Sequence, residues 1–413
     1  MNPANAPLAG LRIVEVSAFI AAPLGGMTLA QLGAEVIRID PLGGNIDHTR
    51  WPLAPSGNSI YWASLNKGKK SVTLALDTPE GQELARAIMC APGAGGGTVL
   101  TNLPAKGWMS FEALSRHDPE LIMMRLVGNF DGSPAMDYTV NCASGFPIAT
   151  GINKDPVNHV LPAWDVAAGL YLCVGLLAAE RARRLDGRGQ VVVLALSDVM
   201  LATVANLGYV ADVQINGASR EPLGNDLYGA FGRPFATADQ REVMLVAISN
   251  RQWKAITRAT GLADRLAMIG PLMNVDLATE GGLFAARHAI AAVLAPWFAA
   301  RTVAQIKEIF DGSGVLWGLY QDFRQLVEDD PRCSLANPMF GEVDQPGIGR
   351  ILSARVPLAF ARNMAPPPST APLLGADTAR VLEKTVGLSP GDIRRLRERR
   401  VIDDSADEDV SPA

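Results

Sequence analysis

Residues 11–39 read LRIVEVSAFIAAPLGGMTLAQLGAEVIRI, and this stretch decides the fold. It opens with Leu11–Val16, an apolar run rich in Val and Ile that is typical of a buried strand, and it closes with a second such run, Glu35–Ile39. Between the two runs, Met27–Leu32 has helical character and ends at Gly33. Because two strands joined by a short helix pair in parallel, the stretch predicts an α/β unit.

The same alternation continues along the chain. Ser71–Leu76 predicts a third strand, and Pro79–Met89 predicts a helix that follows the cap candidates Asp77 and Thr78. A long amphipathic helix is expected from about Val166 to Arg184, with a basic last turn that suits the helix dipole. Gln190–Leu196 then predicts another strand. We therefore expect a large α/β domain with a parallel sheet.

A Gly-, Pro- and Asn-rich break at Arg220–Phe235 separates this region from a second one. Arg241–Ser249 predicts a strand there, and mixed helical stretches follow it, so we expect a smaller α+β domain over residues 225–330. Two short helices are expected near the end of the chain, Thr378–Val386 and Pro390–Arg400. The acidic, polar stretch 403–413 is expected to be a disordered tail.

Composition excludes several classes of protein. The 413 residues are 48% hydrophobic and carry a net charge of −5, which does not suit a nucleic-acid-binding protein. The four cysteines and four histidines lack ligand spacing, so no metal site is expected. The N-terminus has no signal-peptide pattern, and the longest apolar runs, such as Leu170–Ala179, look too short to span a bilayer. We expect a cytoplasmic protein with no membrane partner.

Asp165 is the candidate nucleophile. It ends the sequence Leu-Pro-Ala-Trp-Asp directly before the long helical pattern, where an Asp is most often an N-cap. The same position also suits catalysis, because the helix dipole and free N–H groups would keep the carboxylate ionised. An ionised, partly desolvated carboxylate can attack an activated acyl carbon. The local sequence leaves both roles open.

The loop Asn66–Ser71, which reads NKGKKS, is the candidate anion site. Lys67, Lys69 and Lys70 lie within it. Such a run on its own is more often a solvated surface turn. The alternative is a phosphate contact, which Lys side chains and loop amides suit. Arg38, at the end of the second strand, could add to such a site, because ligands gather at the carboxyl ends of parallel strands.

Two common enzyme classes lack their motifs. No G-x-G-x-x-G follows the first strand, so the dinucleotide fingerprint is missing. No G-x-S-x-G elbow is present, which leaves Ser-His-Asp hydrolysis without support. Gly93–Gly97 resembles a phosphate loop only in composition, and a surface loop is the expected structure.

In order and spacing, these motifs resemble the family III (CaiB/BaiF) CoA-transferases over nearly the whole chain. The nucleophile of that family falls on Asp165, followed by Gly169 and by a turn at Gly187–Gln190. The other segments that carry the resemblance are Pro7–Val16, Ala22–Pro23, Leu32–Ile39, Pro41, Gly43–Gly44, Arg50, Asn66–Ser71, Asn102, Met136–Asn141, Gly145, Gly175–Leu177, Leu374–Thr378, Val381–Leu382, Gly387–Leu388 and Val401–Ile402.

The resemblance implies a fold and an activity. It implies a Rossmann-like large domain built from both ends of the chain, residues 1–215 and 340–402, and an interlocked homodimer. Asp165 would form an aspartyl anhydride and then an aspartyl-CoA thioester, with CoA as a thioester substrate rather than a bound cofactor. The residues implied near CoA are Val16, Arg38, Asn66, Lys67, Lys69, Lys70, Asn102 and Arg125.

The resemblance also limits the acid. Asp137, Tyr138 and Asn141 are implied in the substrate pocket, and their sequence is similar to a branch that moves CoA from C1 to C4 of mesaconate within one molecule. Transfer between two different acids remains an alternative. An α-methylacyl-CoA racemase is a second alternative, but Met136 stands where that branch has its histidine and cannot shuttle a proton. A non-catalytic CoA-binding relative would not need Asp165.

Overall fold

The computed structural model describes residues 5–93, 95–152, 155–217, 219–362 and 365–403. They form two units. The larger unit comprises Met1–Ser144, Val160–Gln214 and Pro331–Ala413, and the smaller unit comprises Gly145–His159 and Ile215–Asp330. The sequence assigned Gly145–His159 to the large domain, but this segment belongs to the smaller unit, where the carbonyl of Ala149 accepts a hydrogen bond from the amide of Leu223 (2.9 Å). Beyond Asp403, the predicted tail lies outside the described residues.

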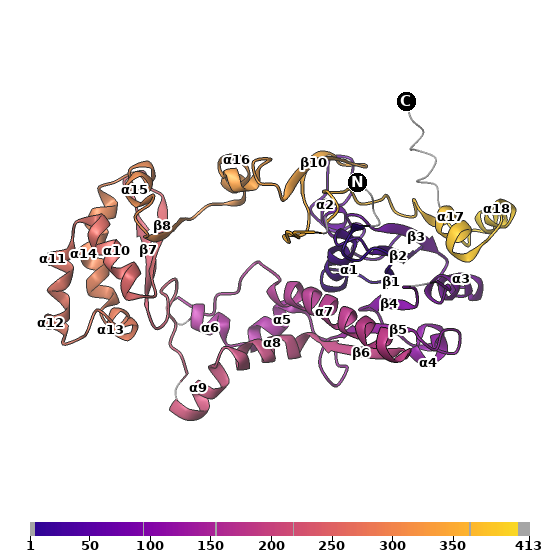
Figure 1. Ribbon diagram of the computed structural model, residues 1–413, viewed down its shortest axis with the longest axis horizontal. Coiled ribbons are helices and arrows are strands. Elements are labelled where there is room, and N and C mark those ends of the chain that lie inside the picture. Colours follow the sequence, from indigo (N-terminus) through magenta and orange to yellow (C-terminus); the bar gives the residue numbers. More distant parts are fainter. Residues whose placement is uncertain (1–4, 94, 153–154, 218, 363–364, 404–413) are drawn as a thin grey trace. The chain divides into compact units, whose positions relative to one another are not determined.

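The larger unit is built on a six-stranded parallel sheet with the order β3-β2-β1-β4-β5-β6 (Figure 1). The strand order reverses between β1 and β4, so the crevice for a ligand is expected at the carboxyl ends of these two strands. The α/β prediction is confirmed. The strands are β1 (Arg12–Val16), β2 (Glu35–Pro41), β3 (Lys70–Leu74), β4 (Thr98–Thr101), β5 (Ile122–Val127) and β6 (Gln190–Ala195).

Helices cover both faces of this sheet. Buried side chains of α3, α4 and α18 pack on one face, and those of α1 and α7 pack on the other. The helices of the larger unit are α1 (Ala21–Gln31), α2 (Ile60–Leu65), α3 (Pro79–Met89), α4 (Phe111–Leu114), α5 (Asp137–Ala143), α7 (Ala163–Asp186), α8 (Leu196–Asn206), α17 (Thr378–Val381) and α18 (Pro390–Glu398). Helix α9 (Tyr209–Asn216) crosses the boundary between the units.

Helix α1 is longer than the sequence predicts. It begins at Ala21 rather than near Met27, so Gly25 lies inside a helix. A Cβ on Gly25 would stand 3.0 Å from the carbonyl oxygen of Gly169 in α7, and a Cβ on Gly169 would stand 2.8 Å from the carbonyl oxygen of Ala21. These glycines therefore let two helices approach closely, a tertiary reason that overrides their low helix propensity.

The C-terminal part of the chain completes the sheet layer. The amide of Ser71 in β3 donates to Asp377 (2.9 Å), and the amide of Thr73 donates to Thr378 (3.1 Å). Helix α17 lies beside β3 in Figure 1, and the two-stranded ribbon of β10 (Phe340–Gln345) and β11 (Gly349–Ala354) also belongs to this unit. Since the returning chain binds the outer edge of β3, this edge is not left open.

The smaller unit has its own core around a three-stranded antiparallel sheet, β7-β8-β9. Strand β7 was not predicted, because it overlaps the Gly- and Pro-rich break. The elements are α6 (Phe146–Thr150), β7 (Phe231–Ala236), β8 (Glu242–Ala247), α10 (Asn250–Thr260), α11 (Ala263–Ala267), α12 (Ile269–Met273), α13 (Glu280–Ala285), α14 (Arg287–Ala299), α15 (Val303–Phe310), β9 (Leu316–Leu319) and α16 (Phe323–Asp329).

Helix α7 corrects the expectation that no segment could span a bilayer. By length and composition it could cross a membrane, as could two bent helix pairs if each were a single span. Within this fold, however, α7 packs against α1 and the sheet through Leu172 and Leu176, both fully buried. One side of this long apolar helix is therefore part of the core of the larger unit.

Candidate active site

Asp165 is not the N-cap of α7. The helix begins at Ala163, so Asp165 lies in its first turn, and the capping position is Pro162, which has no side-chain hydrogen bond to give. The cap comes from Asp137 at the start of α5. One oxygen of its carboxylate, Oδ2, accepts hydrogen bonds from the amides of Trp164 (2.7 Å) and Asp165 (3.0 Å). A second acidic residue, 28 positions earlier in the chain, therefore satisfies the start of this helix.

This arrangement changes the charge balance at Asp165. Burial, and then the negative charge of Asp137, raise the pKa of the Asp165 carboxyl from 3.8 to about 6. The sequence led us to expect that free N–H groups of the helix would hold Asp165 ionised, but Asp137 occupies those groups. Asp165 is still mostly ionised at neutral pH, and it is more basic than an ordinary aspartate.

A cavity of about 280 Å³ lies beside Asp165 at the carboxyl ends of the central strands. Pockets for drug-sized ligands usually range from roughly 300 to 1,000 Å³, so this one suits a small acid better than a whole nucleotide. It lies within the larger unit. Its lining residues are Phe19, Ile20, Ala21, Arg50, Tyr61, Asn102, Leu126, Val127, Gly128, Ala135, Met136, Asp137, Tyr138, Asp165 and Leu196.

The loop after β1 forms one wall of this cavity. Asn102 holds the loop, since its side chain donates to the carbonyl of Ala18 (2.7 Å) and accepts from the amide of Ala18 (3.0 Å). Phe19 follows with a left-handed φ of 67°, a conformation that bulky residues rarely adopt. Helix α1 then begins, and its first amides, those of Ile20 and Ala21, have no acceptor among the described residues.

The predicted pocket residues take different positions. Tyr138 lines the cavity, and its hydroxyl donates to the carbonyl of Val160 (3.3 Å). Asn141 is fully buried behind the cavity, where its side-chain oxygen accepts from the indole N–H of Trp164 (3.1 Å). Asn141 therefore supports the start of α7 rather than lining the pocket.

Much of the predicted cationic site is buried. Arg38 is 1% exposed and pairs with Asp40 (2.8 Å) and Asp47 (3.0 Å). Lys69 is likewise buried and binds Glu15 (2.8 Å), while burial lowers its pKa to about 8. The side chains of Arg38 and Lys69 both donate to Asn66.

These contacts leave Arg38 and Lys69 no surface from which to reach a phosphate. We assign both of them to the network that fixes the ends of β1 and β2. The direct phosphate contact expected for them is therefore not available in this structure.

The remaining predicted CoA residues are less enclosed. Lys67 is half-buried, donates to the carbonyl of Ala354 (3.3 Å) and has a pKa lowered by burial. Lys70 is also half-buried and pairs with Glu35. Arg125, on β5, has a buried Nε without a hydrogen-bond partner among the described residues. Val16 is in the core, so only its main chain could contact a ligand. Lys67, Lys70 and Arg125 are thus only partly enclosed.

Sequence reasoning missed two residues of the cavity. Arg50 entered only as one position of the family resemblance, and Tyr61 was not singled out. The guanidinium of Arg50 lies over the rings of Phe19 (5.6 Å) and Tyr61 (5.2 Å). The Tyr61 hydroxyl is buried without a partner, and burial raises its pKa to about 12. No local pattern would have found them, because they meet Asp165 only in the folded chain.

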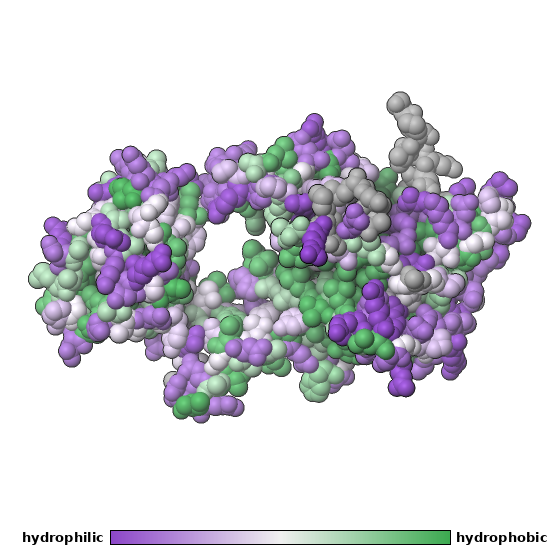
Figure 2. Space-filling model, viewed as in Figure 1, coloured by the Kyte–Doolittle hydropathy of each residue, from purple (hydrophilic) through white to green (hydrophobic). Residues whose placement is uncertain are grey.

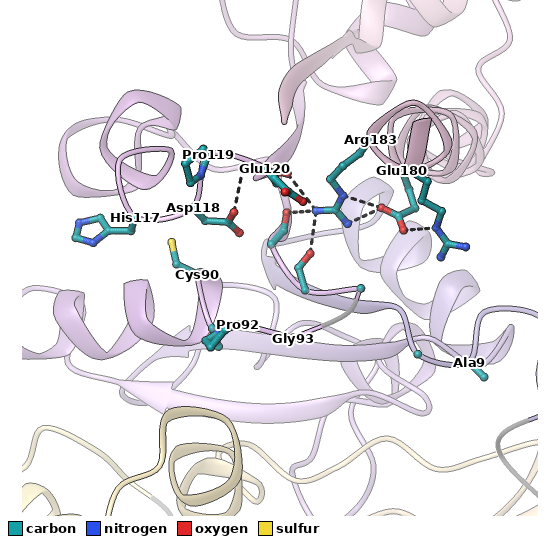
Figure 3. A pocket seen from close by; sticks show the side chains of 16 residues that line it. Ala9, Cys90, Pro92, Gly93, His117, Asp118, Pro119, Glu120, Glu180 and Arg183 are labelled. Carbon is teal, nitrogen blue, oxygen red and sulfur yellow. Dashed lines mark hydrogen bonds and ion pairs between the residues drawn. The ribbon is translucent and has the colours of Figure 1, made fainter. Parts of the chain in front are cut away.

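A larger hollow, of about 680 Å³, lies at the opposite end of the sheet (Figure 3). Here Arg183, near the end of α7, is buried and donates to the carbonyls of Gly96 (2.9 Å), Gly97 (3.0 Å) and Glu120 (3.2 Å). It also pairs with Glu180. All these interactions join parts of the chain to each other, so we regard this hollow as a structural junction.

Metal ligands do not gather in the described part of the chain. No group of three or more His, Cys, Asp or Glu side chains could hold a metal ion there. The four cysteines are all free thiols.

The family model for CoA-transferase family III matches residues 8–378. This chain belongs to CoA-transferase family III. It is 50% identical over 398 residues to a 2-methylfumaryl-CoA isomerase of Chloroflexus aurantiacus, a match that covers 96% of this chain and 97% of that protein. It is 27% identical to a succinyl-CoA--D-citramalate CoA-transferase of the same organism, over 96% of this chain and 98% of that protein.

Solved structures support the same fold. A CAIB/BAIF family protein from Brucella suis superposes with a TM-score of 0.76 at 24% identity, covering 92% of this chain and all of that one. Rv3272 from Mycobacterium tuberculosis gives a TM-score of 0.73 at 23% identity, covering 91% of this chain and 98% of that one. The transferase with a parallel α/β sheet that the sequence predicted is thus confirmed at the level of family and fold.

Proposed function

We propose that this CoA-transferase moves CoA between the two carboxylates of one molecule, from C1 to C4 of 2-methylfumarate (mesaconate). The observation that carries the proposal is the 50% identity to a 2-methylfumaryl-CoA isomerase along nearly the whole chain. The small cavity beside Asp165 supports it, because a freed diacid has to stay at the nucleophile until it reacts again.

The reaction is proposed to proceed in four acyl transfers. A carboxylate oxygen of Asp165 attacks the thioester carbon, and the C–S bond breaks to give a mixed anhydride and CoA thiolate. The thiolate attacks the Asp165 carbonyl carbon, which frees the acid and leaves an aspartyl-CoA thioester. The other carboxylate of the acid attacks this thioester and expels the thiolate. The thiolate then attacks the new acyl carbon and regenerates Asp165, with no net proton transfer.

Each attack creates a negatively charged oxygen that needs hydrogen-bond donors. The amides at the start of α7 are occupied, since those of Trp164 and Asp165 bind Asp137. We assign this task instead to the amides of Ile20 and Ala21, which begin α1, line the cavity and have no acceptor among the described residues. The dipole of α1 would add to their effect.

CoA itself is proposed to lie along the loop that leads into β3, which carries Lys67, and along β5, which carries Arg125. Lys67, Lys70 and Arg125 are the cations we assign to its phosphates, while the main chain of Val16 and the side chain of Asn102 face the pantetheine arm. Lys67 and Lys70 support this assignment by being half-buried rather than fully enclosed. The enzyme is proposed to work in the cytoplasm.

We further propose a homodimer, interlocked as the family resemblance implies. Several apolar side chains of the larger unit are exposed on and near α7, where Figure 2 shows apolar surface. Leu170 is 51% exposed and Val174 is 63% exposed, and both lie on α7. A stripe of this kind usually marks a protein interface. Sedimentation of the purified protein would test it: a monomer at micromolar concentration would reject the dimer.

The test of function is incubation of the enzyme with mesaconyl-C1-CoA and no added acid. Appearance of the C4 thioester by chromatography is expected. Reaction only after addition of an external acid would reject intramolecular transfer and leave the intermolecular alternative. The racemase alternative predicts deuterium from the solvent at Cα of a 2-methylacyl-CoA; Met136, which lines the cavity, offers no proton for that exchange.

A further inference from the structure

The cavity beside Asp165 has an unequal charge lining. Two acidic residues line it, the partly exposed Asp165 and the buried Asp137, and Arg50 is the one basic residue among the lining residues. A dicarboxylic acid brings further negative charge, which the two aspartates repel. Such a ligand can bind in this cavity only if a positively charged group offsets that repulsion.

Arg50 is fixed in a position from which it can do so. Its main-chain carbonyl accepts from the hydroxyl of Ser59 (2.5 Å), and its guanidinium lies over the rings of Phe19 (5.6 Å) and Tyr61 (5.2 Å). The left-handed backbone of Phe19 directs that residue's ring toward the same group. No ion pair involves Arg50 in the part of the chain that the structure describes, so its N–H donors are not committed to an acid of the protein.

Tyr61 supplies a second donor. Its hydroxyl oxygen is buried and has no hydrogen-bond partner among the described residues, although its ring lines the cavity. A buried hydroxyl without a partner is unusual and points to a group that is supplied by a ligand. A guanidinium and a phenol on one wall match the geometry of a carboxylate, since guanidinium donors form a planar fork.

We infer that Arg50, together with the hydroxyl of Tyr61, binds the carboxylate of the diacid that is not reacting at Asp165. This inference rests on the proposed function and adds the residue that selects a dicarboxylic acid over a monocarboxylic one. The same contact keeps the freed acid in the cavity while CoA is attached to Asp165, so it favours intramolecular transfer.

The test compares two substrates across three variants. The substrates are mesaconyl-C1-CoA and the CoA thioester of 2-methylbut-2-enoic acid, which carries a methyl group in place of the distal carboxylate. Arg50→Met keeps the apolar stem over the rings, Arg50→Lys keeps the charge without the fork, and Arg116→Met removes an exposed arginine outside the cavity as the matched control. Isomerisation is measured for the diacid, and exchange of isotope-labelled acid into the thioester is measured for the monoacid.

For Arg50→Met, kcat/KM for the diacid is expected to fall about 10- to 100-fold, the usual consequence of losing hydrogen bonds to a charged group. Monoacid exchange is expected to change less than about 2-fold, because that acid lacks the carboxylate that Arg50 would hold. Arg50→Lys should lie between Arg50→Met and the wild type. Labelled mesaconate should enter the thioester in a larger fraction of turnovers in Arg50→Met, because the freed acid escapes more often.

Equal losses for both acids, or an unchanged rate with the diacid, would overturn the inference. The proposed function is judged separately, on the wild type alone. A wild-type enzyme that makes no C4 thioester but exchanges added acids would reject intramolecular transfer, while the ratio of diacid to monoacid activity in Arg50→Met would still decide the role of Arg50.

Discussion

Replacing Asp165 with asparagine should separate two effects of this carboxylate: its role as nucleophile and the loss of stability caused by its buried charge. Burial and the charge of Asp137 raise the pKa of Asp165 from 3.8 to about 6. A pKa difference of about 2 units corresponds to a loss of roughly 3 kcal/mol in the free energy of unfolding as an upper limit. Because Asp165 is partly exposed, solvent reduces this loss, and we expect about 1–3 kcal/mol. Asparagine is neutral at every pH and avoids this cost.

The direction with pH follows from proton binding. Because the folded-state pKa of Asp165 is raised, the folded protein binds more protons than the unfolded chain between pH 4 and about 6. The free energy of unfolding therefore falls as pH rises through this window. Above about pH 6, the charged Asp165 carboxylate destabilises the folded protein by its full amount. Asp165→Asn is expected to match the wild type near pH 4 and to be more stable near pH 8.

The assay is thermal unfolding of both proteins at a series of pH values from 4 to 8. Because both proteins share the other carboxylates, the difference between their melting temperatures at each pH reports on Asp165 alone. At pH 8 the melting temperature of Asp165→Asn is expected to be higher by up to a few degrees. CoA transfer should be lost at every pH, because an amide cannot form the anhydride. Asp264→Asn is the matched control, since it removes an exposed Asp from the first turn of α11. An Asp165→Asn protein that gains no stability between pH 4 and 8, or that still transfers CoA, would contradict these roles of Asp165.

Three further substitutions test the surroundings of the site. Asp137→Asn should lower the pKa of Asp165, so the acidic limb of the pH–rate profile should move to lower pH; a limb that stays or moves upward would contradict this. Gly26→Ala should destabilise the protein by about 1–3 kcal/mol in thermal unfolding, because its Cβ would overlap Glu15, whereas an uncrowded helix would gain about 1 kcal/mol. Asn102→Ala should lower kcat/KM roughly 10-fold by releasing the loop after β1, and unchanged kinetics would contradict that role.

The sequence predicted the elements whose signal is local. Strands β1 and β2 are buried on both faces, so they appear as continuous apolar runs. Helix α3 has its cap in Thr78, whose side chain accepts from the amide of Gly81. By contrast, the first half of α1 contains Pro23 and Gly25, which locally indicate a loop. Their helical conformation depends on contact with α7, and that contact is invisible along the sequence.

The candidate site likewise has features that the sequence shows locally and features that depend on tertiary contacts. Asp165 could be identified from a motif and a family pattern, but its environment could not. The buried pairing of Arg38 and Lys69 joins side chains from separate strands and loops, so spacing gave no indication that these cations were already paired. Charge patterns in a sequence report which cations exist, whereas only packing decides which of them water or a ligand can reach.

The start of α7 shows why the site uses two acidic residues. Two or three backbone N–H bonds lower the pKa of the carboxyl that accepts them, and so weak a base would be a poor nucleophile. Asp137 accepts those bonds from the amides of Trp164 and Asp165, which leaves the carboxylate of Asp165 outside them. Burial raises the pKa of Asp165, and the negative charge of Asp137 raises it further, so the nucleophile is more basic. Helix capping and nucleophilic attack, which the sequence had offered as alternatives for one residue, are thus divided between two, and the capping residue adds to the basicity that burial gives the other.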